Sequence, residues 1–392
     1  MNEGSAAVIA GVRELLPVLR ERAQETEDRR ALSAETVKSL TETGFFRLLQ
    51  PVRFGGLEAE PVTFLEAVRL IAAACGSTGW VASVMGVHNW QLALFPDQAQ
   101  QEVWAQDPAT RMSSSYAPTG KVSAVDGGYR LSGRWSFSSG CDHATWVLLG
   151  GIVPPAASGA PADFCTFLVP ATDYRIDDVW NTIGLRGSGS NDIVIEDAFV
   201  PSYRALSFND TAKCVCPGQQ VNPGPLYRIP YGSLFPYAIT TPILGMATGA
   251  YDAHVEYTRG RVRASYVGVK AAEDPFAQVR VARAASDLDS AWLALATNMR
   301  ELMEYTTAGA KIPMPLRLRT RRDQVRGTEQ AISAVDLLFE NSGGRAIAVG
   351  TPIQRFWRDA HAGRVHAIND PERALSMYGR GEFGLPLADA ML

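Results

Sequence analysis

The chain has 392 residues, of which 46% are hydrophobic and 20% are charged, and its formal net charge is -4 at pH 7. This length predicts two or three soluble domains, and the sequence contains no apolar run near the ~18 residues that a membrane-spanning helix requires. The slightly acidic balance gives little support to nucleic-acid binding, so we expect a small-molecule substrate.

The N-terminal segment and the cysteines favour a cytoplasmic protein. Arg13 and Glu14 lie within an amphipathic stretch, which is unlike the apolar core of a secretory signal peptide. The five cysteines do not form a disulfide framework, and only Cys214 and Cys216 are close together, without a second cluster of metal ligands. We therefore expect neither a membrane anchor nor a metal site.

Residues 1–112 show the spacing of amphipathic helices. Apolar residues recur at helical intervals over 9–19, and Ser33 marks the start of a second helix that ends at Gly44. Further helical patterns cover 64–72 and 77–94, the last of them apolar on every side. We therefore predict an N-terminal helical domain over 1–112.

From Tyr116 the hydrophobic period changes to that of strands. Residues 122–125 and 129–137 flank a Gly-rich turn and predict a β-hairpin. Further strands are predicted over 145–152, 164–169, 174–180 and 192–200. The section 113–202 is therefore predicted to be a small antiparallel β-domain.

The rest of the chain divides into a loop and a helical section. Residues 203–236 contain five prolines and little periodicity, which predicts a Pro-rich functional loop or linker. The basic run 317–326 has apolar residues at helical spacing, which favours a solvated or subunit-facing helix surface. Over 237–392 we predict a C-terminal helical bundle, from long patterns at 238–257, 274–308, 315–341 and 352–368.

One segment carries a specific signature. Residues 180–191, Trp-Asn-Thr-Ile-Gly-Leu-Arg-Gly-Ser-Gly-Ser-Asn, resemble the middle-domain signature of the acyl-CoA dehydrogenase superfamily. The glycines let the backbone approach a planar cofactor, to which Arg186, Ser188 and Ser190 offer hydrogen-bond donors. The resemblance implies a mainly α fold with a central antiparallel β-barrel and a C-terminal four-helix bundle. Because the sequence lacks a Walker or dinucleotide-binding glycine motif, we expect any nicotinamide cofactor to bind another protein.

A second motif separates this chain from the dehydrogenases of that superfamily. After Arg358-Asp359-Ala360, His366 and Ala367 stand where those dehydrogenases carry Tyr and the catalytic Glu. The missing carboxylate opposes acyl-CoA oxidation, whereas an imidazole suits removal of a phenolic proton near neutral pH. Together with 135–143 and 342–346, the motif resembles the reduced-flavin-dependent aromatic hydroxylases of two-component monooxygenases, above all those that act on secosteroid phenols in actinobacterial sterol degradation.

The resemblance implies an oxygenase that takes reduced FMN or FAD from a separate NAD(P)H:flavin reductase. With dioxygen it would form a flavin C4a-hydroperoxide and hydroxylate a bulky phenol of secosteroid type ortho to its hydroxyl. A homotetramer is also implied. The loop 203–236 supplies apolar residues that either wall a long substrate pocket or pack against a neighbouring subunit: Leu206, Phe208, Val221, Leu226, Ile229, Leu234 and Phe235.

Site residues are carried over by position. The resemblance assigns the catalytic base to His366, the hydroxyl that meets flavin N5 to Ser139, and substrate contacts to His88, Ser114 and Tyr116. The flavin contacts are Trp80, Trp135, Ser138, Ser139, Gly140, a phosphate-binding Arg263 with Arg259 or Arg261 as alternatives, and Gly343 and Gly344 from a neighbouring subunit. His143, His254 and His361 are expected to be structural, as are Trp90 and Trp357.

Other activities remain open at this point. They are hydroxylation of another aromatic or polyketide phenol, N-oxygenation of an amino sugar, sulfur oxidation, and the role of a catalytically inactive flavin-fold scaffold. A substrate without an acidic phenol would need no base such as His366. The joint presence of His88, Ser139 and His366 argues against an inactive scaffold.

Overall fold

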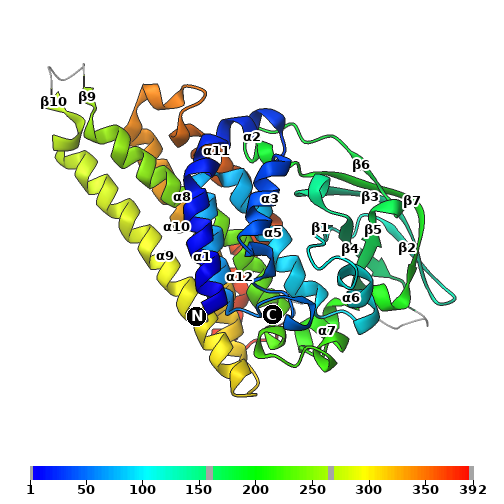
Figure 1. Ribbon diagram of the computed structural model, residues 1–392. Coiled ribbons are helices and arrows are strands. Elements are labelled where there is room, and N and C mark those ends of the chain that lie inside the picture. Colours follow the sequence, from blue (N-terminus) through cyan, green and yellow to red (C-terminus); the bar gives the residue numbers. More distant parts are fainter. Residues whose placement is uncertain (1–2, 156–161, 264–268, 388–392) are drawn as a thin grey trace.

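The computed structural model describes residues 3–155, 162–263 and 269–387. Long helices form one side of the molecule and the sheets form the other, as Figure 1 shows. The acyl-CoA dehydrogenase-like order of helices, sheets and helices predicted from the sequence is confirmed.

The N-terminal part is helical. Ser33 accepts a hydrogen bond from the Thr36 amide, which confirms the predicted start of the helix that follows it. The helix that begins at Gly76 is buried at every residue, so its lack of an amphipathic pattern reflects its central position. The helices are α1 (Glu3–Glu21), α2 (Ala23–Arg29), α3 (Ala34–Glu42), α4 (Pro61–Ala74), α5 (Gly76–Leu92) and α6 (Asp97–Trp104), of which α2 and α6 are not predicted from the sequence.

The strands form two four-stranded sheets. The first has the order β1 (Met112–Ser115), β4 (Trp146–Val153), β5 (Asp163–Pro170) and β8 (Ala205–Ser207). The second has the order β2 (Lys121–Val125), β3 (Gly128–Ser138), β7 (Asn191–Pro201) and β6 (Arg175–Asp177). Strands β1 and β8 are not predicted, and β1 pairs with β4 in parallel, whereas the other pairs are antiparallel.

The predicted closed barrel is wrong. Among the described residues no ladder joins the two sheets, which pack face to face instead. Val147 and Leu149 of β4 lie in the core between the sheets, whereas Leu148 lies in the core shared with the helices. Both faces of this sheet are therefore covered, one by the second sheet and the other by the helices.

Trp135 lies at the centre of the core between the sheets. Its side chain has no exposed surface, and its Nε1 donates to the carbonyl oxygen of Gly150 at 2.8 Å. The side chain is therefore not available to a cofactor, contrary to the expectation from the sequence. We expect Trp135→Ala to lower the free energy of unfolding by about 3–5 kcal/mol, the usual cost of removing a buried Trp. Urea unfolding measures this, and a loss under about 1 kcal/mol would contradict the burial.

The C-terminal part is a bundle in which α8 packs against α4, α10 and α11. Arg317 and Arg321 of the basic run are buried, whereas Arg319 and Arg322 are half-buried and Arg326 is exposed, so only part of this helix surface is solvated. The elements are α7 (Phe208–Lys213), α8 (Tyr231–Arg259), β9 (Val262–Arg263), β10 (Val269–Lys270), α9 (Pro275–Thr307), α10 (Met314–Ser342), α11 (Pro352–Arg364) and α12 (Pro371–Glu382).

The segment 203–236 is not a simple loop. It contains β8, α7 and the start of α8, which accommodates Pro236 inside the helix. Val221 is 37% exposed, but the other six apolar residues singled out in this segment are buried and pack into the helical core. The segment is therefore part of the folded body rather than a linker.

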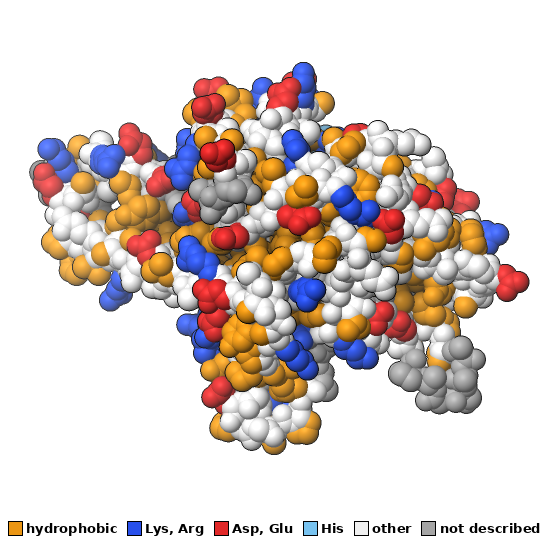
Figure 2. All heavy atoms as spheres, turned by 60° about the horizontal axis from the view of Figure 1, so that its bottom comes forward, with side chains coloured by type: hydrophobic (Ala, Val, Ile, Leu, Met, Phe, Trp, Pro, Cys, Tyr) orange, Lys and Arg blue, Asp and Glu red, His pale blue; other side chains and the backbone are white. Residues whose placement is uncertain are grey.

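The surface carries interspersed charges. On the face drawn in Figure 2, positive and negative side chains alternate without a large patch of one sign. This agrees with the small net charge of the chain and gives no electrostatic footprint for nucleic acid on that face. In the described part of the chain, no helix is both long and apolar enough to cross a membrane.

Candidate active site

A cluster of hydroxyl groups lies where β3 ends. Trp80 of α5 donates its Nε1 hydrogen to Ser139 Oγ at 3.0 Å, and Ser139 Oγ lies 2.7 Å from Ser190 Oγ. Ser190 Oγ is in turn 2.7 Å from Ser188 Oγ. Next to Ser139, Gly140 has a φ of 70° and donates its amide hydrogen to the Ser188 carbonyl. The fold thus joins α5, β3 and the segment before β7 at Ser139.

The aromatic side chain that β3 exposes is Phe137. It is 69% exposed, and its ring meets that of Trp180 edge-on with centroids 6.1 Å apart. A β-bulge between Trp135 and Ser138 places Phe137 at a φ of 69°, so its side chain leaves the inward face that strict alternation would give it. The resemblance over 135–143 includes Phe137 but does not single it out, because nothing in the residue pattern marks this bulge.

His366 lies beside Trp80, with ring centroids 6.0 Å apart. Its Nδ1 accepts a hydrogen bond from the amide of Ile368 at 3.2 Å. Burial lowers the pKa of His366 to about 4, so the ring is neutral at pH 7. Because Nδ1 acts as an acceptor, the single proton of the neutral ring resides on Nε2. In this geometry His366 offers a donor, which does not suit the base expected from the sequence.

His88 of α5 carries its proton on the other ring nitrogen, Nδ1, and not on Nε2 as His366 does. Its Nδ1 lies 2.9 Å from the Met112 carbonyl oxygen, which can only accept, so Nδ1 carries the proton. Its Nε2 is buried and has no hydrogen-bond partner among the described residues. Burial lowers the pKa of His88 to about 4. His88 is therefore a neutral imidazole with a free acceptor, and a buried free acceptor calls for a ligand donor.

Tyr116 continues the site beyond His88, at a ring distance of 6.3 Å. Its hydroxyl donates to Gln91 Oε1, and burial raises the pKa of Tyr116, so the phenol stays protonated. Ser114 precedes it in β1 and is partly buried. The Tyr116 ring is surrounded edge-on by Phe208, Tyr231 and Phe235.

Ser138 turns away from this region. Its hydroxyl is fully buried and donates to Ser113 Oγ of β1 at 3.0 Å, so it links two strands. The sequence groups Ser138 with the flavin contacts, but its side chain is already paired inside the protein. Because the whole residue is buried, the structure gives Ser138 no surface for a cofactor.

The residues expected at the flavin phosphates lie in another part of the fold than the hydroxyl cluster around Ser139. Arg263 belongs to β9, at the outer end of the long helices in Figure 1, and its side chain is outside the described part of the structure. The alternative Arg261 donates to the Ser342 carbonyl at 2.6 Å and packs against Gly343, whose φ is 70°. Around Gly344 a Cβ would meet no atom within 4 Å. A single chain does not bring these residues to Ser139.

The remaining histidines have structural partners. His143 Nε2 lies 3.1 Å from the Leu32 carbonyl oxygen, His254 Nδ1 2.7 Å from Ser342 Oγ, and His361 Nε2 2.9 Å from Asp336 Oδ1. Two surface clefts of about 320 and 310 Å³ are lined by none of the catalytic, substrate or flavin residues predicted from the sequence, although His143 lines the first of them. The chemistry therefore concentrates along α5, between Trp80 and His88.

Comparison with known proteins bears on this arrangement. Residues 6–111 match the family described as "Acyl-CoA dehydrogenase, N-terminal domain", and residues 237–371 match "Acyl-CoA dehydrogenase, C-terminal domain". The flavin-dependent monooxygenase oxygenase subunit HsaA of Rhodococcus jostii (strain RHA1) is 59% identical over 378 residues, which cover 96% of this chain and 98% of that protein.

Two solved structures are similar over nearly the whole chain. The crystal structure of 3-HSA hydroxylase from Rhodococcus sp. RHA1 has a TM-score of 0.94 at 58% identity, covering 98% of this chain and 99% of that one. XiaF from Streptomyces sp., solved in complex with FADH2 and glycerol, has a TM-score of 0.90 at 27% identity, covering 98% and 97%.

Proposed function

The chain belongs to the acyl-CoA dehydrogenase-like family of flavin-dependent monooxygenase oxygenase subunits, and from this premise we propose that it hydroxylates a bulky phenol. As such an oxygenase subunit it uses reduced flavin and depends on a separate flavin reductase. Acyl-CoA oxidation does not fit, because Ala367 occupies the position of the dehydrogenase glutamate.

The residues around Ser139 suit a flavin ring. The exposed ring of Phe137 can stack on a planar group. We assign flavin N5 to the Ser139 hydroxyl, which is largely buried and already contacts Trp80 and Ser190. Gly140 lets the end of β3 pack closely against α5, because a Cβ there would lie 2.8 Å from Val81 Cγ1. When bound, reduced flavin supplies the reaction with dioxygen. We assign Phe137, Ser139, Gly140 and Trp80 to its binding.

The phosphate end of the flavin is assigned to Arg263, together with Gly343 and Gly344 of a second copy in a homotetramer. The arrangement of the strands supports a second copy, because β9 lies at the outer end of the long helices, whereas β3, which directly precedes Ser139, lies among the sheets on the other side (Figure 1). Gly343 and Gly344 present a backbone without side chains, which suits a closely approaching phosphate.

We assign different roles toward the phenol to His88 and His366. His88 Nε2, the buried free acceptor, takes the hydrogen bond of the phenol hydroxyl, and it takes the proton as the ring carbon reacts and that hydroxyl becomes strongly acidic. The Nε2 hydrogen of His366 donates to an oxygen of the reacting groups. Tyr116 and Ser114 contact the same end of the substrate as His88. The surrounding aromatic side chains exclude water from the hydroxyl that reacts.

The dimensions of the site favour a substrate with several rings. Trp80 and His88 are eight positions apart on α5, which corresponds to roughly 12 Å along a helix. The far end is walled by the aromatic rings around Tyr116. One of the similar proteins of known structure is a 3-HSA hydroxylase, which supports a phenol of secosteroid type. The single observation that carries the proposal is the free acceptor of His88 inside this apolar wall.

Substrate selectivity tests the proposal. Burying additional fused-ring carbons at about 25 cal/mol per Å² favours the larger phenol by roughly 2–4 kcal/mol over a single ring. We therefore expect kcat/KM for a secosteroid phenol to exceed that for p-hydroxyphenylacetate by about 30- to 1000-fold. Both constants are measured with the same reductase. Equal or reversed values would be compatible with a phenol hydroxylase but would contradict a secosteroid phenol as the preferred substrate.

A further inference from the structure

Residues 182–190, between β6 and β7, have an unusual backbone. Leu185 has a φ of 50° and Gly189 a φ of 51°, and the first of these is unfavourable for a residue with a side chain. The segment ends at Ser190, whose hydroxyl meets Ser139 Oγ and also contacts the hydroxyl of Ser188. Its shape therefore decides how the hydroxyl cluster meets β3, and an unfavourable shape needs external support.

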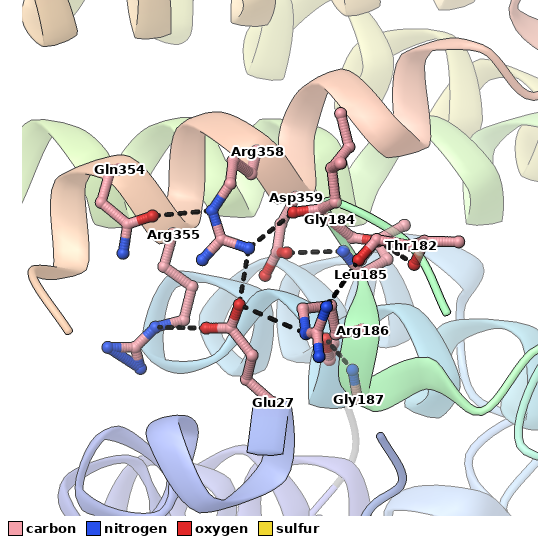
Figure 3. A network of polar contacts seen from close by, with 12 residues as sticks. Glu27, Thr182, Gly184, Leu185, Arg186, Gly187, Gln354, Arg355, Arg358 and Asp359 are labelled. Carbon is pink, nitrogen blue, oxygen red and sulfur yellow. Dashed lines mark hydrogen bonds and ion pairs between the residues drawn. The ribbon is translucent and has the colours of Figure 1, made fainter. Parts of the chain in front are cut away.

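The support comes from helices on two sides of the segment, as Figure 3 shows for most of these contacts. A Cβ on Gly184 would lie 2.1 Å from the Arg358 carbonyl oxygen, so this position accepts only glycine. Helices α11 and α5 hold the backbone by three hydrogen bonds: Leu185 N–H to Asp359 Oδ1 at 2.6 Å, Arg358 Nη1 to the Ile183 oxygen at 2.6 Å, and Gly187 N–H to Ser77 Oγ at 3.2 Å.

Glu27 of α2 is the carboxylate at the centre of this network. It is buried, and its Oε1 lies 2.5 Å from Arg358 Nη1 and 3.8 Å from Arg186 Nε. Its Oε2 lies 3.7 Å from Arg355 Nε. Three guanidinium groups thus converge on one buried carboxylate. Without it they would repel one another where water screens poorly, and Arg358 would leave the Ile183 oxygen.

The same short helix also holds the aromatic part of the surface. Arg30, directly after α2, donates to Asp178 and to the Trp180 carbonyl oxygen at 3.0 Å. The Trp180 ring packs against Phe137, and its Nε1 donates to the Leu185 oxygen. Helix α2 is therefore coupled to both the hydroxyl cluster and the exposed ring.

We propose that Glu27 is a positioning residue for the reduced-flavin surface. By holding Arg358 and Arg186, it keeps residues 182–190 at the distance from β3 at which Ser190 meets Ser139. The inference rests on the proposed function, because it takes Ser139 and Phe137 as flavin contacts. Glu27 itself touches neither flavin nor substrate.

Glu27→Gln in the full-length protein tests this role, since it keeps the shape and removes the charge. In flavin-free protein, hydrogen exchange at the amides of 182–190 should become at least about tenfold faster. The dissociation constant of reduced FMN, measured without oxygen, should rise about tenfold. Turnover at saturating reduced flavin should change much less, and Glu27→Asp should recover part of the affinity. Glu25→Gln, in an exposed pair with Arg29 on the same helix, is the matched control and should change neither quantity.

Unchanged exchange or unchanged reduced-FMN affinity in Glu27→Gln overturns the inference. Phe137→Ala, measured in parallel, separates a failure of the role of Glu27 from a failure of the assigned flavin surface. If Phe137→Ala weakens reduced-FMN binding and Glu27→Gln does not, only the role of Glu27 fails. If neither variant affects binding, the flavin surface is misassigned and both fail. Should Glu27→Gln not fold, Arg186→Gln replaces it, because that side chain is one-third exposed, and the same two outcomes decide.

Discussion

Replacing His88 with asparagine is expected to lower the rate of phenol hydroxylation by about 10²- to 10⁴-fold, the usual effect of losing a positioned proton acceptor. The asparagine Nδ2 stands near the place of the histidine Nδ1, so the variant keeps a donor for the Met112 carbonyl oxygen. It lacks an acceptor at the position of Nε2. Reduced flavin should still be oxidised, with hydrogen peroxide in place of product. Quantifying both in one reaction checks the expectation.

His366→Ala is the matched comparison. It removes a hydrogen-bond donor rather than the proton acceptor, so product formation should fall by only about 10- to 100-fold. The order of the two effects is the decisive quantity. If His366→Ala proved the more damaging substitution, the proton acceptor would be His366, as the resemblance in the sequence implies, and its bond to the Ile368 amide would have to open first.

The helices and most strands are predictable because their patterns are local. Ser33 marks its helix by a side chain that caps its own backbone, and the hairpin of β2 and β3 follows from alternation around one turn. The parallel pairing of β1 with β4 is not predictable in this way. It depends on residues more than thirty positions apart, such as Ser113 and Val147, and three consecutive serines resemble a turn.

In the candidate site, too, some features are predictable from the sequence and others depend on residues that only folding brings together. The resemblance assigns Ser139, Trp80, His88 and His366 to the site, but it does not give the protonation of the two imidazoles. That depends on a carbonyl oxygen and an amide hydrogen of the backbone, which only the folded chain brings to each ring. Likewise, Glu27 lies in a seven-residue helix without a sequence signature, and its partners Arg186 and Arg358 are distant in the chain.

The buried histidines should also make the protein unstable in acid. His88 and His254 have no exposed surface, and burial lowers the pKa of each from 6.5 to about 4. Between these values the unfolded chain binds their protons and the folded protein does not. Their contribution to stability is therefore complete above pH 6.5 and is lost as the pH falls toward 4, at about 1.4 kcal/mol per pH unit for each histidine.

One buried carboxyl group acts in the opposite direction. Burial raises the pKa of Asp359 from 3.8 to about 7, so the folded protein binds its proton over the window in which the unfolded chain has released it. Protonation of Asp359 therefore stabilises the folded state as the pH falls. It offsets the loss of stability that about one of the two histidines causes. The partly buried His366, whose pKa is also lowered, adds a smaller loss in the same direction as the two histidines.

The net expectation is a fall of at least about 3 kcal/mol in the free energy of unfolding between pH 6.5 and 4. Urea unfolding at a series of pH values measures the slope. His254→Gln should flatten it by about 1.4 kcal/mol per pH unit, whereas Asp359→Asn, which keeps an oxygen for the Leu185 amide, should steepen it by the same amount. A slope that both substitutions change in the same direction would contradict the assignment, because the two groups bind their protons in opposite states of the chain.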